Sequence, residues 1–332
     1  MKAAVYERYG APDVLQIKDV EKPAPMENEV LIKVRAASVN PLDKLIKGKP
    51  YIVRGMTGLR KPKLTRLGAD LAGQVEAVGR NATQFKPGDE VFGTSRHGTF
   101  AEYVCADEKK LALKPANLTF DQAAAVPVAA ITALQGLRDK GRIQPGQKVL
   151  INGAAGGVGT FAVQIAKSFG ADVTGVCSTR NVHMVRSIGA DHVIDYTQED
   201  FTKSGPKRAQ RYDLFFDCVG NHSLSACRRV LNPKGIYIAV GATSDGRWIG
   251  PLARLFKTLL LAPFVRPKMV VFIALINKQD LVVLKELMEA KKVTPVIDRC
   301  YTLSEVPEAI RYLEEGHAQG KVVITVEHSN DT

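Results

Sequence analysis

The chain contains 332 residues, 45% of them hydrophobic and 24% charged, which suffices for the cores of two domains. Its formal charge of +12 suits anionic ligands, but no nucleic-acid-binding module accompanies the basic residues, so nucleic acid is not expected as a partner. No run of about 18 apolar residues occurs, so we expect no transmembrane segment, and the N-terminus lacks the apolar core of a signal peptide. Five scattered cysteines without CxxC spacing argue against disulfides and structural zinc and favour a reducing compartment, so we predict a cytoplasmic location.

Residues 2–122 are predicted to be mainly β-structure. Apolar and polar side chains alternate over residues 30–35 and 100–104, and short glycine-bounded runs occupy 73–79 and 88–93. Many short strands separated by glycine and proline suggest a compact, partly open barrel. The following stretch, residues 123–137, predicts a helix that is broken near Pro127.

A strand, a glycine-rich turn, a helix and a second strand are predicted between residues 148 and 181. The strand Val149-Leu150-Ile151 leads into the sequence Gly153-Ala154-Ala155-Gly156-Gly157-Val158-Gly159. Apolar residues then recur at helical spacing until Gly170, and residues 173–177 form the next strand. This pattern is the βαβ unit of dinucleotide-binding, or Rossmann, domains; the alternative is an ordinary strand–helix turn.

The glycines of this turn have separate steric roles. Gly156 would let the main chain approach a pyrophosphate, and Gly159 would let the helix pack closely on the strand. The free amides at the start of the helix would then face the anion. Because Ala154 stands where the usual pattern begins with glycine, the strict fingerprint is not met. The residues expected at the cofactor are Ala155, Gly156, Gly157, Val158 and Gly159.

The end of the second strand indicates which dinucleotide is bound. NAD sites usually place an acidic residue there to bind the ribose 2′-hydroxyl. This chain instead has Cys177-Ser178-Thr179-Arg180-Asn181, whose hydroxyls and guanidinium suit a 2′-phosphate. Arg180 could also be a solvated residue at a helix start, although a cation is unfavourable against the helix dipole there. We therefore predict NADPH as the cofactor.

The alternation of strands and helices continues to residue 277 and predicts a parallel, doubly wound sheet and an α/β fold. Strands are predicted at 192–194, 212–217, 236–240 and 269–276, and helices at 182–188 and 224–231. The last segment is predicted as helix 280–291, strand 296–298, helix 305–315 and strand 322–326.

Residues 247–268 place apolar side chains largely on one helical face, among Arg and Lys residues and without an acid. We favour a lid over an apolar acceptor pocket, because the segment closely follows a strand at the ligand-binding edge of the sheet. The alternative is an interfacial helix on anionic lipid, which would make a peripheral membrane contact. The next residues, 269–276, form a long apolar edge strand that predicts a homodimer through strand pairing, unless the chain's own helices cover it.

Several motifs, spread in order over nearly the whole chain, resemble one family. They are Val39-Asn40-Pro41-Leu42-Asp43-Lys44, Gly68-Ala69-Asp70-Leu71-Ala72-Gly73, the turn 154–159, Arg180-Asn181, Ser187-Ile188-Gly189-Ala190-Asp191, Asp195-Tyr196 and Gly320-Lys321-Val322-Val323. With these motifs the chain resembles the zinc-independent quinone oxidoreductases of the medium-chain dehydrogenase/reductase superfamily. Within them, it is most similar to the branch of the chloroplast envelope quinone oxidoreductase homologue. As a set, the motifs are specific for fold and cofactor class and much less so for substrate.

The resemblance implies a Rossmann doubly wound parallel sheet plus a chaperonin-10-like β-barrel catalytic domain. The barrel would consist of residues 1–122 and 278–332, and the NADPH-binding domain of residues 123–277. The nicotinamide is expected near Asn40, Thr132, Cys218, Val219, Gly241 and Ala242. The 2′-phosphate is expected among Ser178, Arg180 and Tyr196, with Asn181 where bacterial relatives carry a phosphate-binding lysine, and Lys321 is expected at the cofactor as well.

Zinc alcohol dehydrogenases share this architecture and are the main competing class. They need a thiolate near position 40 and a Gly-His-Glu segment near position 68 to build an open catalytic site. This chain has Asn40 and Gly68-Ala69-Asp70 there, and it lacks the lobe of four cysteines that holds their structural zinc. No metal is therefore expected.

The resemblance implies hydride transfer from NADPH to a quinone or to the C=C bond of an activated enone, with a large apolar acceptor. The expected hydrogen-bond donors to the developing enolate are Asn40, Lys44 and Tyr51. Alternatively Asn40 only forms a turn, Lys44 is solvated and Tyr51 packs on the barrel, while Asp43 either orients Lys44 or caps its short helix. Two other functions remain open: an NADPH-binding regulatory or nucleic-acid-binding protein without significant turnover, and an alcohol dehydrogenase.

Overall fold

The computed structural model describes residues 1–48, 51, 54–203, 211–240 and 267–328. The chain divides into two compact units. The first consists of Met1–Ile131, Leu275–Lys291 and Pro295–Thr332, and the second of Thr132–Ala274 and Lys292–Thr294. The domain boundaries predicted from the sequence lie between residues 122 and 123 and between residues 277 and 278. Most of the predicted lid segment, residues 247–266, lies outside the described residues.

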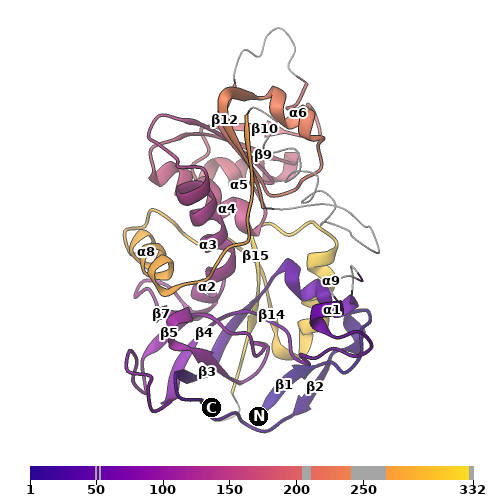
Figure 1. The fold of residues 1–332 in the computed structure, drawn as a ribbon, viewed down its shortest axis with the longest axis vertical. Coiled ribbons are helices and arrows are strands. Elements are labelled where there is room, and N and C mark those ends of the chain that lie inside the picture. The colour runs from indigo at the N-terminus through magenta and orange to yellow at the C-terminus, as the bar shows by residue number, and fades with distance from the viewer. Residues whose placement is uncertain (49–50, 52–53, 204–210, 241–266, 329–332) are drawn as a thin grey trace. The chain divides into compact units, whose positions relative to one another are not determined.

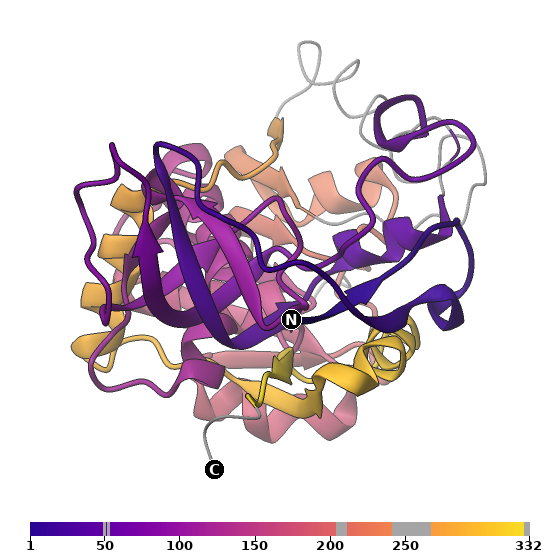
Figure 2. The ribbon, with the colours of Figure 1, turned by 90° about the horizontal axis from the view of Figure 1, so that it is seen from below.

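Strand β3 (Glu29–Val39) is the centre of a seven-stranded sheet in the first unit. It pairs with β4 (Asp70–Val78) along one edge, and two strands share its other edge. β6 (Tyr103–Asp107) pairs with the first part of that edge, and β15 (Lys321–Thr325) pairs with its last four residues. The C-terminal strand therefore completes a sheet begun near the N-terminus, so both terminal segments contribute to this unit (Figure 2).

The remaining elements of this unit lie around that sheet. Its other strands are β5 (Glu90–Thr94), β7 (Leu111–Leu113) and β14 (Ile297–Thr302), and β1 (Lys2–Val5) pairs separately with β2 (Gln16–Asp19). Its helices are η1 (Pro12–Val14), η2 (Pro41–Lys47), α1 (Arg54–Thr57), η4 (Glu108–Lys110), α2 (Phe120–Ala124), α8 (Lys278–Glu289), η8 (Leu303–Glu305) and α9 (Val306–Glu314). The predicted break near Pro127 is confirmed, because α2 ends at Ala124 and α3 (Pro127–Gln135) begins at the proline.

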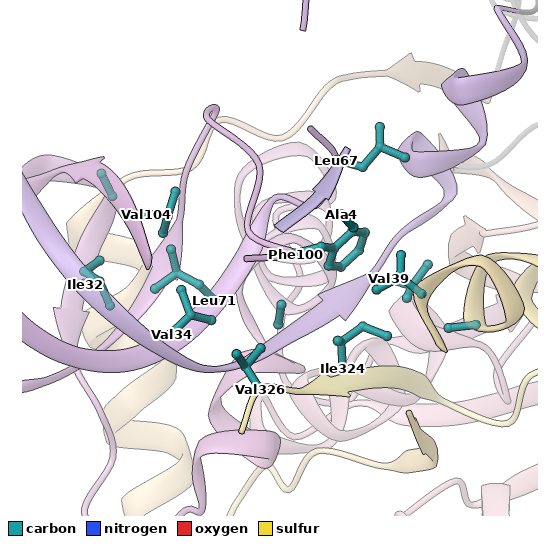
Figure 3. Packing of buried hydrophobic residues seen from close by; sticks show 14 of the residues in the cluster. Ala4, Ile32, Val34, Val39, Leu67, Leu71, Phe100, Val104, Ile324 and Val326 are labelled. Atoms are coloured by element: carbon teal, nitrogen blue, oxygen red, sulfur yellow. The ribbon is translucent and has the colours of Figure 1, made fainter. Parts of the chain in front are cut away.

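The core of the first unit is filled by side chains from strands that are distant in sequence (Figure 3). Because side chains alternate along a strand, Ile32 and Val34 of β3 point to the same interior as Leu71 of β4. Phe100, just before β6, and Ile324 of β15 join them, and all five side chains are fully buried. Burying a side chain of this size contributes about 1.5–3 kcal/mol to the stability of the fold, and this packing fixes where the ends of β3 lie.

The second unit contains a six-stranded sheet in the order β10-β9-β8-β11-β12-β13. Figure 1 labels β9, β10 and β12 of this sheet. The strands are β8 (Lys148–Asn152), β9 (Asp172–Cys177), β10 (His192–Asp195), β11 (Tyr212–Asp217), β12 (Leu231–Ala239) and β13 (Lys268–Val271). All neighbouring pairs are parallel. Numbered along the chain, this order is 3-2-1-4-5-6, that of the doubly wound dinucleotide-binding fold, which confirms the predicted fold class. The order reverses between β8 and β11, so their carboxyl ends flank the place where such folds bind ligands.

Helices follow the strands as the apolar spacing predicts. α4 (Gly157–Ser168) packs on β8 and β9, and α5 (Val182–Ser187) packs on β10. Gly170, with a φ of 77°, follows the end of α4. The unit also contains η5 (Gly136–Lys140), η6 (Thr179–Asn181) and α6 (Leu224–Arg229). None of the helices within the described residues has the length and apolar character needed to cross a membrane.

The predicted strand 269–276 is wrong in its second half. β13 ends at Val271, and residues 272–277 have no regular structure. Its partner β12 ends at Ala239, opposite Val271, so within the described part of this sheet no ladder extends further. Apolar composition alone predicts a strand here, yet Ile273 and Leu275 are 83% and 73% exposed instead of packing in a core.

Candidate functional site

Two positions of the glycine-rich turn after β8, residues 153 and 159, require glycine. Gly153 has a φ of 81°, a conformation that favours glycine, so the tight turn is made one residue before Ala154. Ala154 is fully buried, and a Cβ added to Gly175 of β9 would lie 3.0 Å from the Ala154 Cβ. A Cβ at Gly159 would lie 2.0 Å from the Gly153 oxygen, so the helix does pack too closely on the turn for a side chain. Gly153 thus supplies the tight turn and Gly175 leaves room for the Ala154 side chain, so the turn forms although Ala154 replaces the first glycine of the strict fingerprint.

Gly156 differs from these glycines because the described residues leave room at this position. Among them, an added Cβ would meet only the Gly153 oxygen, at an ordinary contact distance of 3.5 Å, and the φ of −85° suits any residue. Gly156 is also the N-cap of the 12-residue helix α4, whose first amides have no carbonyl of a preceding turn to bind. Open space in front of free N–H groups fits a pyrophosphate, and Ala155, Gly157, Val158 and Gly159 lie along the same turn.

Beside this turn, the end of β11 is fixed by the buried Asp217. Its Oδ1 accepts from the Asn152 amide at 2.9 Å and from the Gly220 backbone at 2.8 Å, and its Oδ2 accepts from the Tyr237 hydroxyl at 2.7 Å. These bonds hold the neighbouring Cys218-Val219 turn against Gly153. A Cβ added to Gly153 would lie 2.7 Å from a Val219 methyl group. The structure thus brings the turns after β8 and β11 together.

The end of β9 carries the residues expected at the 2′-phosphate. The Asn181 side-chain amide donates to the Ser178 hydroxyl at 3.2 Å, and the Tyr196 amide donates to the Cys177 carbonyl at 3.0 Å. Among the described residues, the Asn181 oxygen is one of few buried side-chain acceptors without a hydrogen-bond partner. Arg180 is exposed and the Tyr196 side chain is 58% exposed, so both lie at the surface of this region.

Asp195 is a neighbour of this region that the sequence analysis did not single out as a site residue. It ends β10 opposite Cys177 and accepts hydrogen bonds from the Thr179 hydroxyl at 2.6 Å and the Thr197 hydroxyl at 2.8 Å. These bonds, with that of Thr179 foremost, hold the pKa of the Asp195 carboxyl below its usual range. A carboxylate therefore lies near the end of β9, but its oxygens accept hydrogen bonds from the nearby hydroxyls of Thr179 and Thr197. The signal for Asp195 in the sequence was its position directly after a predicted strand and before Tyr196.

In the first unit, Asn40 and Lys321 meet in a buried polar network. The Lys321 ammonium donates to the Asn40 side-chain oxygen at 2.8 Å and lies 3.4 Å from an oxygen of Asp70. The Asn40 amide nitrogen donates to the same Asp70 oxygen at 2.9 Å and to the Ser38 carbonyl at 3.4 Å. The Ser38 hydroxyl donates to Asp70 as well, at 2.8 Å. Asp70 is the centre of the network, although the sequence analysis named it only as part of a glycine-bounded motif.

Asp43 supports the same turn from the other side. Its carboxylate accepts from the Asn40 backbone amide at 2.7 Å and from the Gly68 amide at 3.0 Å, so it caps η2, which was one of the two predicted roles. Burial raises the pKa of Asp43 to about 6, while the two amides act to lower it. Burial also lowers the pKa of the Lys321 ammonium, opposed by the charge of Asp70. The network thus encloses two carboxyl groups around one ammonium.

The other predicted donors lie further along the same segment. Lys44 is a half-buried residue of η2, and Tyr51 is half-buried beyond it. The Arg54 guanidinium lies over the Tyr51 ring at 4.8 Å and over the Tyr9 ring at 4.6 Å. Thr132 belongs to α3 and lies in the second unit. Gly241 and Ala242 lie outside the described residues.

In the part of the chain that the structure describes, no three His, Cys, Asp or Glu side chains are arranged to hold a metal ion. At the position where zinc relatives need a thiolate, the Asn40 oxygen instead accepts from the Lys321 ammonium. A group that already binds a cationic side chain is a poor ligand for a metal cation.

Comparison with known proteins gives matches along the chain. Residues 26–116 match the family model described as alcohol dehydrogenase GroES-like domain, and residues 188–324 match zinc-binding dehydrogenase. The NADPH-dependent alkenal/one oxidoreductase, chloroplastic, of Arabidopsis thaliana is 37% identical over 98% of this chain and 79% of its own length. The chloroplast envelope quinone oxidoreductase homolog of the same plant is 31% identical over 98% of both chains.

Among solved structures, the quinone oxidoreductase from Coxiella burnetii is similar over 98% of this chain and 99% of its own, with 31% identity and a TM-score of 0.84. Similarity at this level over nearly the full length agrees with the open glycine turn, the six-stranded parallel sheet and the sheet completed by the C-terminal strand. The chain belongs to the medium-chain dehydrogenase/reductase superfamily, in its zinc-independent quinone oxidoreductase branch.

Proposed function

We propose that this chain is an NADPH-dependent oxidoreductase that reduces quinones or the carbon–carbon double bond of activated enones without zinc. The observation that carries the cofactor class is the open turn at Gly156 beside a β9 terminus that bears hydroxyls and a guanidinium. The acceptor class follows from the relatives, whose names are those of an alkenal/one oxidoreductase and a quinone oxidoreductase.

NADPH, when bound, supplies the hydride. In this proposal the first amides of α4 bind its pyrophosphate, and Ser178, Arg180 and Tyr196 bind its 2′-phosphate. Asn181 acts through Ser178: because its amide donates to the Ser178 oxygen at 3.2 Å, the hydroxyl proton is directed away from Asn181 and toward a ligand. An asparagine thus contributes where bacterial relatives use a lysine.

The first unit would supply the hydrogen bonds to the acceptor. Lys44 and Tyr51 are proposed as donors to the oxygen that gains charge as the acceptor is reduced. Asn40 is proposed to fix the turn that carries them, because its amide hydrogens point to Asp70 and to the Ser38 carbonyl. Lys321 is proposed to hold the Asn40 oxygen and to contribute a positive charge to cofactor binding.

A homodimer and a cytoplasmic location also belong to the proposal. β13 is the edge strand of the described sheet, and the exposed Ile273 follows it closely, which favours burial against a second copy. A reducing compartment agrees with the five cysteines, all of which are free.

The test is the decrease of NADPH absorbance by purified protein with an α,β-unsaturated ketone, a benzoquinone, or neither. We expect turnover with at least one acceptor and analysis of the ketone product to show a saturated carbon–carbon bond. Tight NADPH binding without any turnover would favour the regulatory alternative. Oxidation of simple alcohols that a chelator abolishes would instead favour an alcohol dehydrogenase.

A further inference from the structure

Residues 58–66, the basic loop, lie between α1 and β4 in the first unit and carry an unusual charge. From residue 44 to residue 69 the sequence contains eight Lys and Arg residues and neither Asp nor Glu. Within the loop, Arg60, Lys61 and Lys63 are exposed. The neighbouring carboxylate of Glu7 is already bound by the Lys18 ammonium at 2.7 Å, so the charge of the loop faces solvent with little compensation.

Two large apolar side chains are exposed among these charges. Leu59 is 77% exposed and Leu64 is 59% exposed. Single exposed leucines are common, but here two stand within six residues of each other and three cationic side chains lie between and beside them. Apolar side chains framed by Lys and Arg are the composition that proteins use at the boundary between lipid headgroups and acyl chains.

The loop is folded, so these leucines are held outward by structure. Pro62 is buried, and the Lys63 amide donates to the Thr57 carbonyl at 2.8 Å. Gly58 has a φ of 117°, and a Cβ there would lie 2.0 Å from the Lys61 oxygen, so the turn is tight. The Tyr9 hydroxyl donates to the Gly58 carbonyl at 2.7 Å, which fastens the turn to the N-terminal segment.

The far end of the loop is fastened too. The Tyr6 amide donates to the Thr65 carbonyl at 2.8 Å, and Arg66 forms an antiparallel bridge with Val5 of β1. With both ends fixed to the same segment, binding a surface costs little ordering of the backbone.

We propose that the basic loop is a docking surface for anionic lipid bilayers. Leu59 and Leu64 enter the headgroup boundary while Arg60, Lys61 and Lys63 bind lipid phosphates. Lipid fits better than nucleic acid, because the described loop has leucines at its surface and no aromatic side chain on which bases could stack. The proposal does not depend on the reductase activity, since none of these residues belongs to the cofactor or acceptor groups named above.

The test is co-sedimentation of the full-length protein with vesicles of phosphatidylcholine alone or mixed with phosphatidylglycerol in equal parts. We expect binding to the mixed vesicles only, with release at high salt. Lys61→Glu with Lys63→Glu should weaken binding at least about tenfold, because each basic residue near an anionic surface contributes the equivalent of about fivefold. Leu59→Ser with Leu64→Ser should weaken it without changing its salt dependence.

Matched controls are available in the same unit. Lys86→Glu with Lys109→Glu makes the same charge change at exposed positions elsewhere, and Leu113→Ser removes an exposed leucine of β7. Both should bind vesicles like the unmodified protein, and NADPH titration and thermal unfolding check that every variant is folded. Failure of the unmodified protein to bind the mixed vesicles, or equal binding by the loop and control variants, would overturn the proposal. Tight binding to duplex DNA that ignores the leucine changes would overturn it in favour of nucleic acid.

Discussion

The ammonium of Lys321 donates a hydrogen bond to the side-chain oxygen of Asn40 at 2.8 Å, across 281 residues of sequence. Lys321 is the first residue of β15, and Asn40 directly follows β3. The bond thus joins the C-terminal strand to the turn that carries Lys44, at the place where the two strands pair. Because Lys321 is 3% exposed and Asp70 is fully buried, this joint is shielded from water.

Replacing Lys321 with methionine should destabilise the protein strongly. The change removes the cation of a buried network and leaves the Asp70 charge without it, which costs about 3–5 kcal/mol in comparable cases. Urea unfolding measures the loss. Lys18→Met is the control, since the exposed pair with Glu7 should contribute little to stability. A similar small loss for both variants would show that the network adds little stability.

Asp43→Asn should change the pH dependence of stability. A carboxyl whose pKa is raised by burial to about 6 binds a proton more readily in the folded than in the unfolded state, so its contribution to stability falls as pH rises from about 4 to about 6. The difference in unfolding free energy between the unmodified protein and Asp43→Asn should therefore be larger at pH 5 than at pH 7, by about 1 kcal/mol. A difference for Asp43→Asn that stays constant between pH 5 and pH 7 would contradict the assignment.

Two glycines of the turn after β8 should respond oppositely to alanine. Gly156→Ala has room for its Cβ and should change stability by less than about 1 kcal/mol, while weakening NADPH binding about tenfold or more, because the methyl group occupies the open space before α4. Gly159→Ala would place a Cβ 2.0 Å from the Gly153 oxygen and should cost about 1–3 kcal/mol of stability. Calorimetry of the free proteins and fluorescence titration with NADPH separate the two effects. Unchanged NADPH affinity in Gly156→Ala would mean that the pyrophosphate does not bind there.

Arg180→Ala should reduce the preference for NADPH over NADH. A charge-assisted contact with the 2′-phosphate is worth about 1.5–3 kcal/mol, so NADPH affinity should fall at least about tenfold while NADH affinity stays nearly constant. Arg186, an exposed arginine of α5, provides the control, since its replacement by alanine should alter neither affinity. Equal affinities of the unmodified protein for both dinucleotides would refute the predicted cofactor choice.

Ile273→Asp should dissociate the proposed dimer. Ile273 is 83% exposed near the edge strand β13, and an aspartate buried there between two copies would lack a counter-charge. Light scattering at micromolar concentration should show a dimer for the unmodified protein and a monomer for the variant. Met26→Asp, at a residue 70% exposed in the first unit, should leave the dimer intact. A monomer in the unmodified protein would rule the dimer out.

The sequence alone determined most elements of the second unit, because their signals are local. Apolar spacing defines α4, glycine ends it, and the short apolar run of β11 reads as a strand without knowledge of its neighbours. The alternation of such elements leaves few topologies other than a parallel doubly wound sheet. The same reasoning fails after Val271, where apolar composition continues but the partner strand ends, and strand length depends on the partner.

The features of the site also divide into those that local sequence predicts and those that depend on tertiary contacts. The sequence indicated Gly156 and Gly159, because a turn between a strand and a helix restricts which residues fit, and it indicated that β9 ends without a carboxylate. Only the tertiary structure decided that Asp195 stands beside that end and binds Thr179, and that Lys321, Asp70 and Asn40 form one network. These contacts join residues separated by tens to hundreds of positions, and burial shifts the pKa values of Asp43 and Lys321. Distance and burial are properties of the packed chain, so no local pattern in the sequence encodes them.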